Sequence, residues 1–158
     1  MGHVLISEDL NQGFGLSERR LKGIFVAVAL AGLSGAGGVI LSAVAAHLVV
    51  DERLQIAAVF LLLHACAVLA LSGVSVAFPR GHVWLWPAYV LLIGSILFGS
   101  DLALRAIAGS RLFPMAAPIG GTLLILGWFW VGVMGLALLW RSEGDKVLVK
   151  SEPGKTEH

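Results

Sequence analysis

Four long apolar stretches divide this 158-residue chain and restrict its possible folds more than any other feature. They lie at about 23–47, 54–78, 83–107 and 118–140. A helix of about 24 residues is roughly 36 Å long, enough to cross a hydrocarbon core of about 30 Å. The chain is 58% hydrophobic and only 13% charged, whereas soluble domains average roughly 45–50% apolar and about 25% charged residues. The sequence therefore predicts an all-α membrane protein with four transmembrane helices.

Short connections between the predicted spans favour antiparallel neighbours in an up-and-down four-helix bundle. A polar tail at 1–22 precedes the transmembrane domain at 23–140, and a charged tail at 141–158 follows it. With four spans, both tails lie on the same side of the membrane. Eight Lys and Arg residues fall on that side, at 19, 20, 22, 80, 141, 146, 150 and 155, and three on the other, at 53, 105 and 111. The positive-inside rule then predicts that both termini are cytoplasmic.

Several classes of function lack their usual residues in this sequence. The single cysteine, Cys66, excludes an intrachain disulfide and a cysteine metal cluster. The net charge is +1 with no basic patch beyond the tails, which argues against nucleic-acid binding. The chain has no Ser-His-Asp spacing, phosphate loop or nucleotide fingerprint. We therefore expect no catalytic residue, no metal, no cofactor and no enzymatic activity.

Small residues recur along the first predicted span and open the fourth. Ser34, Gly38 and Ser42 are spaced four residues apart, and a row of small side chains lets another helix approach closely. Gly120 and Gly121 lie near the start of the fourth span. We predict that these five residues pack helices and take no part in chemistry.

Ionisable residues within the spans form a candidate polar or ion site made of His47, His64, Asp101 and Arg105. Asp101 and Arg105 are four residues apart and share one helix face. Asp101 lies roughly 27 Å along the third span, near the outer interface, where His47 ends the first span. An ionisable residue inside a membrane is costly, so it usually faces a bundle interior, a partner or water.

Each of these residues has two interpretations that the sequence leaves open. Asp101 can pair with Arg105 and accept hydrogen bonds from the first N–H groups of the fourth helix, which lack intrahelical partners. Alternatively, the pair is a site for an ion or small molecule. His64 lies near the middle of the bilayer, either as a neutral imidazole hydrogen-bonded to a neighbouring serine such as Ser95 or as a proton relay.

Three segments of the chain resemble the YgdD-like family of small bacterial inner-membrane proteins: Leu97–Leu104, Phe113–Thr122 and Leu126-Gly-Trp128. The histidine positions of that family match His47 and the segment at 63–70 around His64. The family has no known function, so the resemblance implies four spans and a multi-pass inner-membrane location but no activity. Where many members carry small residues and tyrosine, this chain has Ser100-Asp101-Leu102-Ala103, so the Asp101–Arg105 pair marks a subgroup.

We therefore expect a small inner-membrane protein that acts as a structural or accessory partner in the lipid bilayer. Such a protein forms a homo-oligomer or binds another membrane protein. The alternative is a small transporter or proton-linked carrier that uses His64 and Asp101. Four spans are few for a transport pathway, so this alternative also requires oligomerisation.

Overall fold

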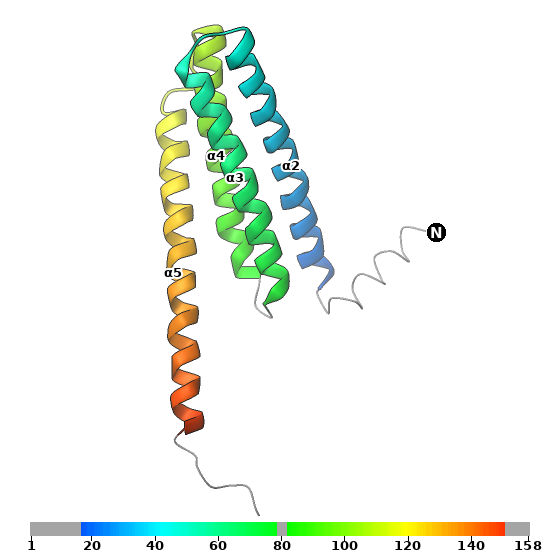
Figure 1. Ribbon diagram of the computed structural model, residues 1–158, viewed down its shortest axis with the longest axis vertical. Coiled ribbons are helices and arrows are strands. Elements are labelled where there is room, and N and C mark those ends of the chain that lie inside the picture. The colour runs from blue at the N-terminus through cyan, green and yellow to red at the C-terminus, as the bar shows by residue number, and fades with distance from the viewer. Residues whose placement is uncertain (1–16, 79–81, 151–158) are drawn as a thin grey trace, which may run out of the picture.

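The computed structural model describes residues 17–78 and 82–150 of the chain, and these residues form four helices and no strand. The helices are α2 (Glu18–His47), α3 (Glu52–Ala77), α4 (His82–Ala108) and α5 (Ala116–Lys150). They run up and down in one bundle, with the start of α2 and the end of α5 at the same end (Figure 1). The predicted all-α, four-helix architecture is confirmed.

The ends of the outer helices differ from the prediction. The first helix begins at Glu18 instead of residue 23, and Lys22 pairs with Glu18 across 2.8 Å in its first turn. The last helix continues to Lys150 instead of ending at residue 140. Hydrophobicity shows where a span leaves the lipid, but charged residues such as Glu, Lys and Arg are good helix formers and extend the helix into water. Of the predicted tails at 1–22 and 141–158, residues 1–16 and 151–158 lie outside the described residues.

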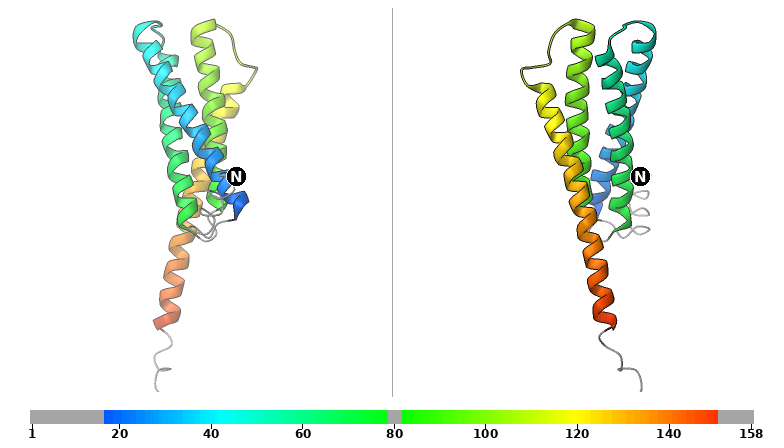
Figure 2. Two further views of the ribbon diagram at one scale, coloured as in Figure 1. Left: turned by 90° about the vertical axis from the view of Figure 1, so that its right-hand side faces the viewer. Right: turned by 60° about the vertical axis from the view of Figure 1, so that its left-hand side comes forward.

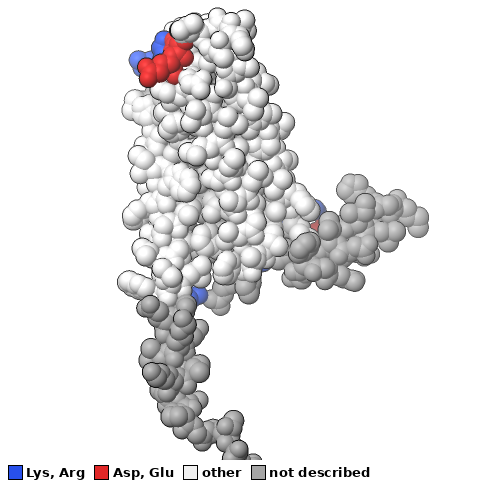
Figure 3. Space-filling model, viewed as in Figure 1, with Lys and Arg blue, Asp and Glu red and all other residues white. Residues whose placement is uncertain are grey.

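Each of the four helices contains a stretch long and apolar enough to cross a membrane: Glu18–His47, Glu52–Ala77, Val83–Ala108 and Ala116–Arg141. Charged side chains gather at the two ends of the apolar body, and the face shown in Figure 3 is uncharged between them. This distribution is typical of a chain that has water at both ends and lipid around its middle.

The first helix packs with a spacing that differs from the predicted four-residue row. From Ile24 onward its buried residues alternate three and four apart, through Ala27, Ala31, Ser34 and Gly38. This is the spacing of a left-handed helix bundle. A step of four residues turns about 40° more than one full turn, so the predicted row leaves the contact face and Ser42 is only half-buried.

Gly38 lies where α2 and α3 are in close contact. A Cβ at this position would meet the Leu62 Cγ atom at 2.8 Å and the Ala58 carbonyl oxygen at 3.0 Å. The contact supports the predicted packing role of Gly38, because a larger residue would force the helices apart.

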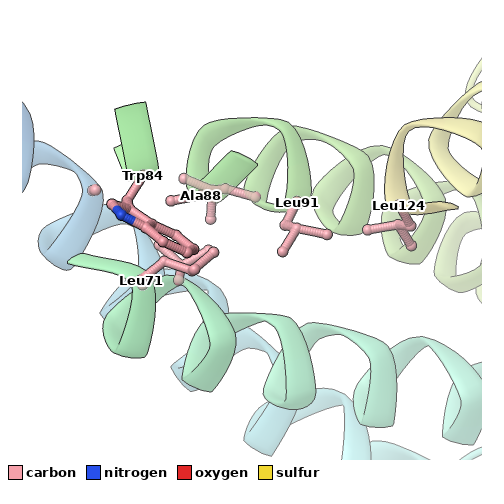
Figure 4. Close-up of a cluster of buried hydrophobic side chains, with 9 residues drawn as sticks. Leu71, Trp84, Ala88, Leu91 and Leu124 are labelled. Atoms are coloured by element: carbon pink, nitrogen blue, oxygen red, sulfur yellow. The ribbon is translucent and has the colours of Figure 1, made fainter. Parts of the chain in front are cut away.

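A buried apolar cluster joins all four helices. Figure 4 shows its labelled members, Leu71 from α3, Leu124 from α5, and Trp84, Ala88 and Leu91 from α4. Ala27 and Ala31 of α2 complete the contact from the other side. The fourth transmembrane helix in the sequence, α5, is nevertheless peripheral, since it packs extensively against α4 alone. Both views in Figure 2 show α5 extending beyond the other helices.

Candidate functional site

Asp101 and Arg105 lie near the C-terminal end of α4, and their side chains form a direct ion pair. The Oδ2 atom of Asp101 is 2.5 Å from Nη2 of Arg105, and the Asp101 side chain is completely buried. Arg105 keeps 25% of its side chain exposed, as expected for a long cation that reaches toward the membrane surface. The geometry matches a local helix pair with one buried and one partly solvated partner.

The second partner of Asp101 differs from the predicted one. Its Oδ1 atom accepts a hydrogen bond of 2.9 Å from the backbone N–H of Leu112, in the loop between α4 and α5. The predicted donors were N–H groups within residues 117–122, but α5 begins with its own turn, in which Ala116 N–H donates to the Phe113 carbonyl. Asp101 therefore holds the loop before α5 and does not cap the helix.

His64 lies on α3 and is 2% exposed. Its Nδ1 atom is 2.7 Å from the Phe60 carbonyl oxygen, and the indole N–H of Trp128 on α5 donates to its Nε2 atom at 3.2 Å. An indole N–H can only donate and a carbonyl can only accept, so Nε2 is unprotonated and Nδ1 carries the proton. The imidazole is thus neutral, and both of its nitrogens are engaged.

Of the two interpretations of His64, the structure matches the hydrogen bond to a neighbouring helix, but the partner is Trp128 and not a serine. Ser95 donates instead to the Leu92 carbonyl of its own helix, at 2.9 Å. Ser72 and Ser75 likewise donate to carbonyls of α3. Serine hydroxyls in apolar surroundings commonly bond back to their own helix in this way.

The aromatic rings of Phe60 and Trp128 lie against the His64 ring. The ring centroids of Phe60 and His64 are 5.6 Å apart, and those of Phe60 and Phe98 are 4.8 Å apart. We call Phe60, His64, Phe98 and Trp128 the aromatic cluster. The hydrogen bonds of the described residues do not connect this cluster to Asp101.

The structure does not bring the four candidate residues to one place. His47 is exposed at the end of α2, while His64 belongs to the aromatic cluster and only Asp101 and Arg105 touch. Within the described part of the chain, no three His, Cys, Asp or Glu residues are close enough to hold a metal ion.

Two polar ties that the sequence did not reveal join the helices at the end where α2 begins. The Nη2 atom of Arg20 donates to the Phe78 carbonyl at 2.7 Å and also to the Ser75 carbonyl. These acceptors lie at the C-terminal end of α3, where carbonyls lack helical partners and a cation is favourable. Tyr89 of α4 donates to the Gly23 carbonyl of α2 at 2.7 Å. Arg20 and the carbonyls that it binds lie on different helices and are 55 or more residues apart, so no local sequence pattern indicates the contact.

Asp51 caps α3 at the opposite end of the bundle. Its Oδ1 atom accepts the backbone N–H of Arg53 at 2.9 Å, and its Oδ2 atom is 2.7 Å from the Arg53 guanidinium. The side-chain and backbone hydrogen bonds from Arg53 hold the pKa of the Asp51 carboxyl below its usual value. The cap therefore stabilises the fold above the unfolded pKa of this carboxyl, and this stabilisation is lost as the pH falls through the lower folded pKa.

Comparisons with known proteins place the chain in a family. The model of a family of proteins of unknown function, DUF423, matches residues 41–121, which are 81 of the 158 residues. The match includes His64, Asp101 and Gly120, whereas Trp128 lies beyond it.

Curated relatives agree with this match. The UPF0382 inner membrane protein YgdD of Escherichia coli strain K12 is 34% identical over 62 residues, which are 38% of this chain and 47% of that protein. The protein of the same name in Shigella flexneri matches equally well. The chain thus spans about half the length of the curated relatives it matches, and no solved structure matches it. Together with four membrane-spanning helices, these matches show that the chain belongs to the DUF423 family and is a multi-pass inner-membrane protein.

Proposed function

We propose that this protein is a non-enzymatic structural or accessory component of the inner membrane that binds another membrane protein or a second copy of itself through α5. The observation that carries the proposal is the exposure of this helix. Only 11% of its most apolar stretch is buried within the chain, compared with 44% for α3 and 39% for α4. A fourth helix attached along one side leaves most of its surface available to a partner.

Small residues on the exposed side of α5 support a helix partner. A Cβ added to Gly132 or Gly135 would meet no atom within 4 Å. Small residues at such open positions allow another helix to approach closely, as in many membrane-helix interfaces. Phe129, three residues before Gly132 and on the same side of the helix, is 70% exposed. Such a surface offers both a close-approach site and an aromatic anchor.

The use of the buried polar groups supports a role without chemistry. His64 has both ring nitrogens engaged, and Asp101 has Arg105 and the Leu112 N–H as partners. These contacts join parts of the protein to one another and satisfy groups that are costly in lipid. His64 and Asp101 are the two ionisable residues on which a carrier mechanism would depend. Within the described spans, the contacts of both residues are with other parts of the protein.

The test is a change of size on the open face of α5. Gly132→Leu fills the proposed contact at a position where the new Cβ would have open space, with no atom of another helix within 4 Å. Gly32→Leu on α2 is the matched control, because Gly32 is also exposed with open space around it. Each variant is purified in mild detergent, and its mass is measured by light scattering together with any co-purifying protein.

We expect the unmodified protein and Gly32→Leu to retain a stoichiometric membrane partner or a homo-oligomer, and Gly132→Leu to lose it. Lipid tails cover an apolar helix as readily as a protein does. If lipid alone surrounds α5, a larger side chain at residue 132 should therefore leave the measured mass unchanged. A protein that is monomeric and without partners in every mild detergent tested contradicts the proposal.

A further inference from the structure

A groove lies between α4 and the C-terminal half of α5, at the end of the bundle where α2 begins. Its volume is about 590 Å³, within the range of about 300–1,000 Å³ that is usual for small-molecule sites. Phe78 and Trp84 form one wall, with ring centroids 6.5 Å apart, and Met134, Leu138 and Arg141 form the other. We call it the α4–α5 groove.

The residues of α5 explain why the groove is at this end. Nearer its start, Gly120 and Gly127 are buried against α4, and a Cβ at either would come within 3.0 Å of its atoms. After Gly127 the positions facing α4 are occupied by larger side chains, among them Met134 and Leu138, which are only half-buried. Packing is therefore close in the first half of α5 and incomplete in the second.

Among the described residues that line the groove, Arg141 is the one that carries a charge. Arg141 lines the groove and is the last residue of the apolar stretch of α5. Trp140 beside it is 77% exposed, and exposed tryptophans at the ends of spans prefer the level of the lipid headgroups. The other described lining residues are apolar. The groove thus offers an apolar wall within the bilayer and a cation at its edge.

We propose that the α4–α5 groove binds one anionic phospholipid of the bilayer. One of its acyl chains lies along Trp84 and Met134, and its phosphate pairs with the guanidinium of Arg141. Guanidinium groups recognise phosphate through parallel hydrogen bonds, and basic pockets between transmembrane helices bind anionic headgroups. A zwitterionic lipid fills the same apolar wall but carries its own cation, which competes with Arg141.

The proposal is tested by lipid retention in the full-length protein. The protein is purified in mild detergent and titrated with phosphatidylglycerol or phosphatidylcholine of identical acyl chains, and bound lipid is counted by native mass spectrometry. We expect the anionic lipid to bind about fivefold more tightly, the effect of one cation near an anionic headgroup. Arg141→Gln should remove this preference, and Arg141→Lys should keep it.

Two further variants separate the groove from general charge attraction. Ala137→Phe places a ring in the groove without changing the charge and should lower retention of the anionic lipid at least as much as Arg141→Gln. Arg111→Gln removes an exposed arginine from the loop between α4 and α5, at the opposite end of the bundle, and should leave retention unchanged. Helix content measured by circular dichroism confirms that each variant is folded.

Three outcomes overturn the proposal. Equal retention of the two lipids by the unmodified protein means that lipid acts only as a solvent. A preference that survives in folded Arg141→Gln assigns the headgroup to another cation. Retention of the anionic lipid that Arg141→Gln lowers but Ala137→Phe leaves unchanged means that phosphate binds at the surface without the groove.

Discussion

Single polar side chains join neighbouring helices of this protein at both ends and in the middle. Arg20 connects α2 to the end of α3, Tyr89 connects α4 to α2, and Trp128 connects α5 to His64 on α3. Asp101 holds the loop between α4 and α5. In lipid, a polar group without a partner is costly, so each of these contacts satisfies a donor or acceptor and at the same time fixes the position of a helix or loop.

The hydrogen bond between Trp128 and His64 can be measured by a double-mutant cycle. Trp128→Phe removes the N–H donor but keeps an aromatic ring, and His64→Leu removes the acceptor. We expect a coupling free energy of about 0.6 kcal/mol, and at most about 1.7 kcal/mol, as found for hydrogen bonds between membrane helices. The measurement is unfolding of the two single variants, the double variant and the unmodified protein in mixed micelles. Trp130→Phe, on an exposed tryptophan of the same helix, should show no coupling to His64→Leu. Strictly additive effects of Trp128→Phe and His64→Leu contradict the assignment.

Loss of the Asp101 carboxylate should release the loop between α4 and α5. Asp101→Ala leaves the Leu112 N–H and the Arg105 guanidinium without their partner. A hydrogen bond to a charged group contributes about 1.5–3 kcal/mol, so we expect trypsin to cleave after the exposed Arg111 roughly tenfold or more faster. Asp101→Asn keeps an oxygen that can accept the Leu112 N–H and should give an intermediate rate. Unchanged cleavage in folded Asp101→Ala shows that other contacts hold the loop.

At the scale of helices, the number and approximate length of the spans were predictable because hydrophobic length alone determines them. The rotation of each helix about its axis was not. Lipid is as apolar as a protein core, so the sequence periodicity of α5 does not distinguish the side that faces α4 from the side that faces lipid. Gly120 and Gly121 are adjacent and chemically identical, yet Gly120 is buried against α4 and Gly121 has open space.

The same two glycines provide the test of helix packing. A Cβ at Gly120 would lie 2.7 Å from the Phe98 backbone nitrogen and 2.9 Å from the Gly94 carbonyl oxygen, atoms that cannot move without the helix. We expect Gly120→Ala to lower the unfolding free energy by about 1–3 kcal/mol. Gly121→Ala, with nothing within 4 Å, should be neutral or stabilising by up to about 1 kcal/mol, because alanine favours a helix. Thermal unfolding in detergent measures both. Equal losses of stability in the two variants contradict this account of the contact between α4 and α5.

The candidate site was only partly predictable for a related reason. Asp101 and Arg105 lie on one helix, so their spacing of four residues was enough to predict the pair. The partner of His64 is 64 residues away on α5, a helix that packs mainly against α4. Sequence spacing gave the depth of His64 in the bilayer but carried no information about which aromatic or polar group faced it.

At the scale of the whole molecule, the helices divide into a packed group and an attached helix. The first three, α2, α3 and α4, all contact one another, whereas α5 depends on α4. Both the proposed protein partner and the proposed lipid use α5, on its open face and in its groove with α4. The helix that contributes least to the core is thus the one with the most surface for binding.

The charges of the molecule predict its orientation in the membrane, and single cysteines can test this prediction. The end where α2 begins and α5 ends carries the excess of Lys and Arg, so we expect it to face the cytoplasm. Cys66 is first replaced by alanine, and then Ser17→Cys or Arg111→Cys is introduced at an exposed position at either end. A membrane-impermeant maleimide added to intact spheroplasts should label Arg111→Cys and should reach Ser17→Cys only after the membrane is opened. Labelling of Ser17→Cys in intact spheroplasts would show that the orientation is the reverse of the predicted one. That orientation would also move the α4–α5 groove to the outer leaflet, where the cytoplasmic surface potential that favours an anionic lipid is absent.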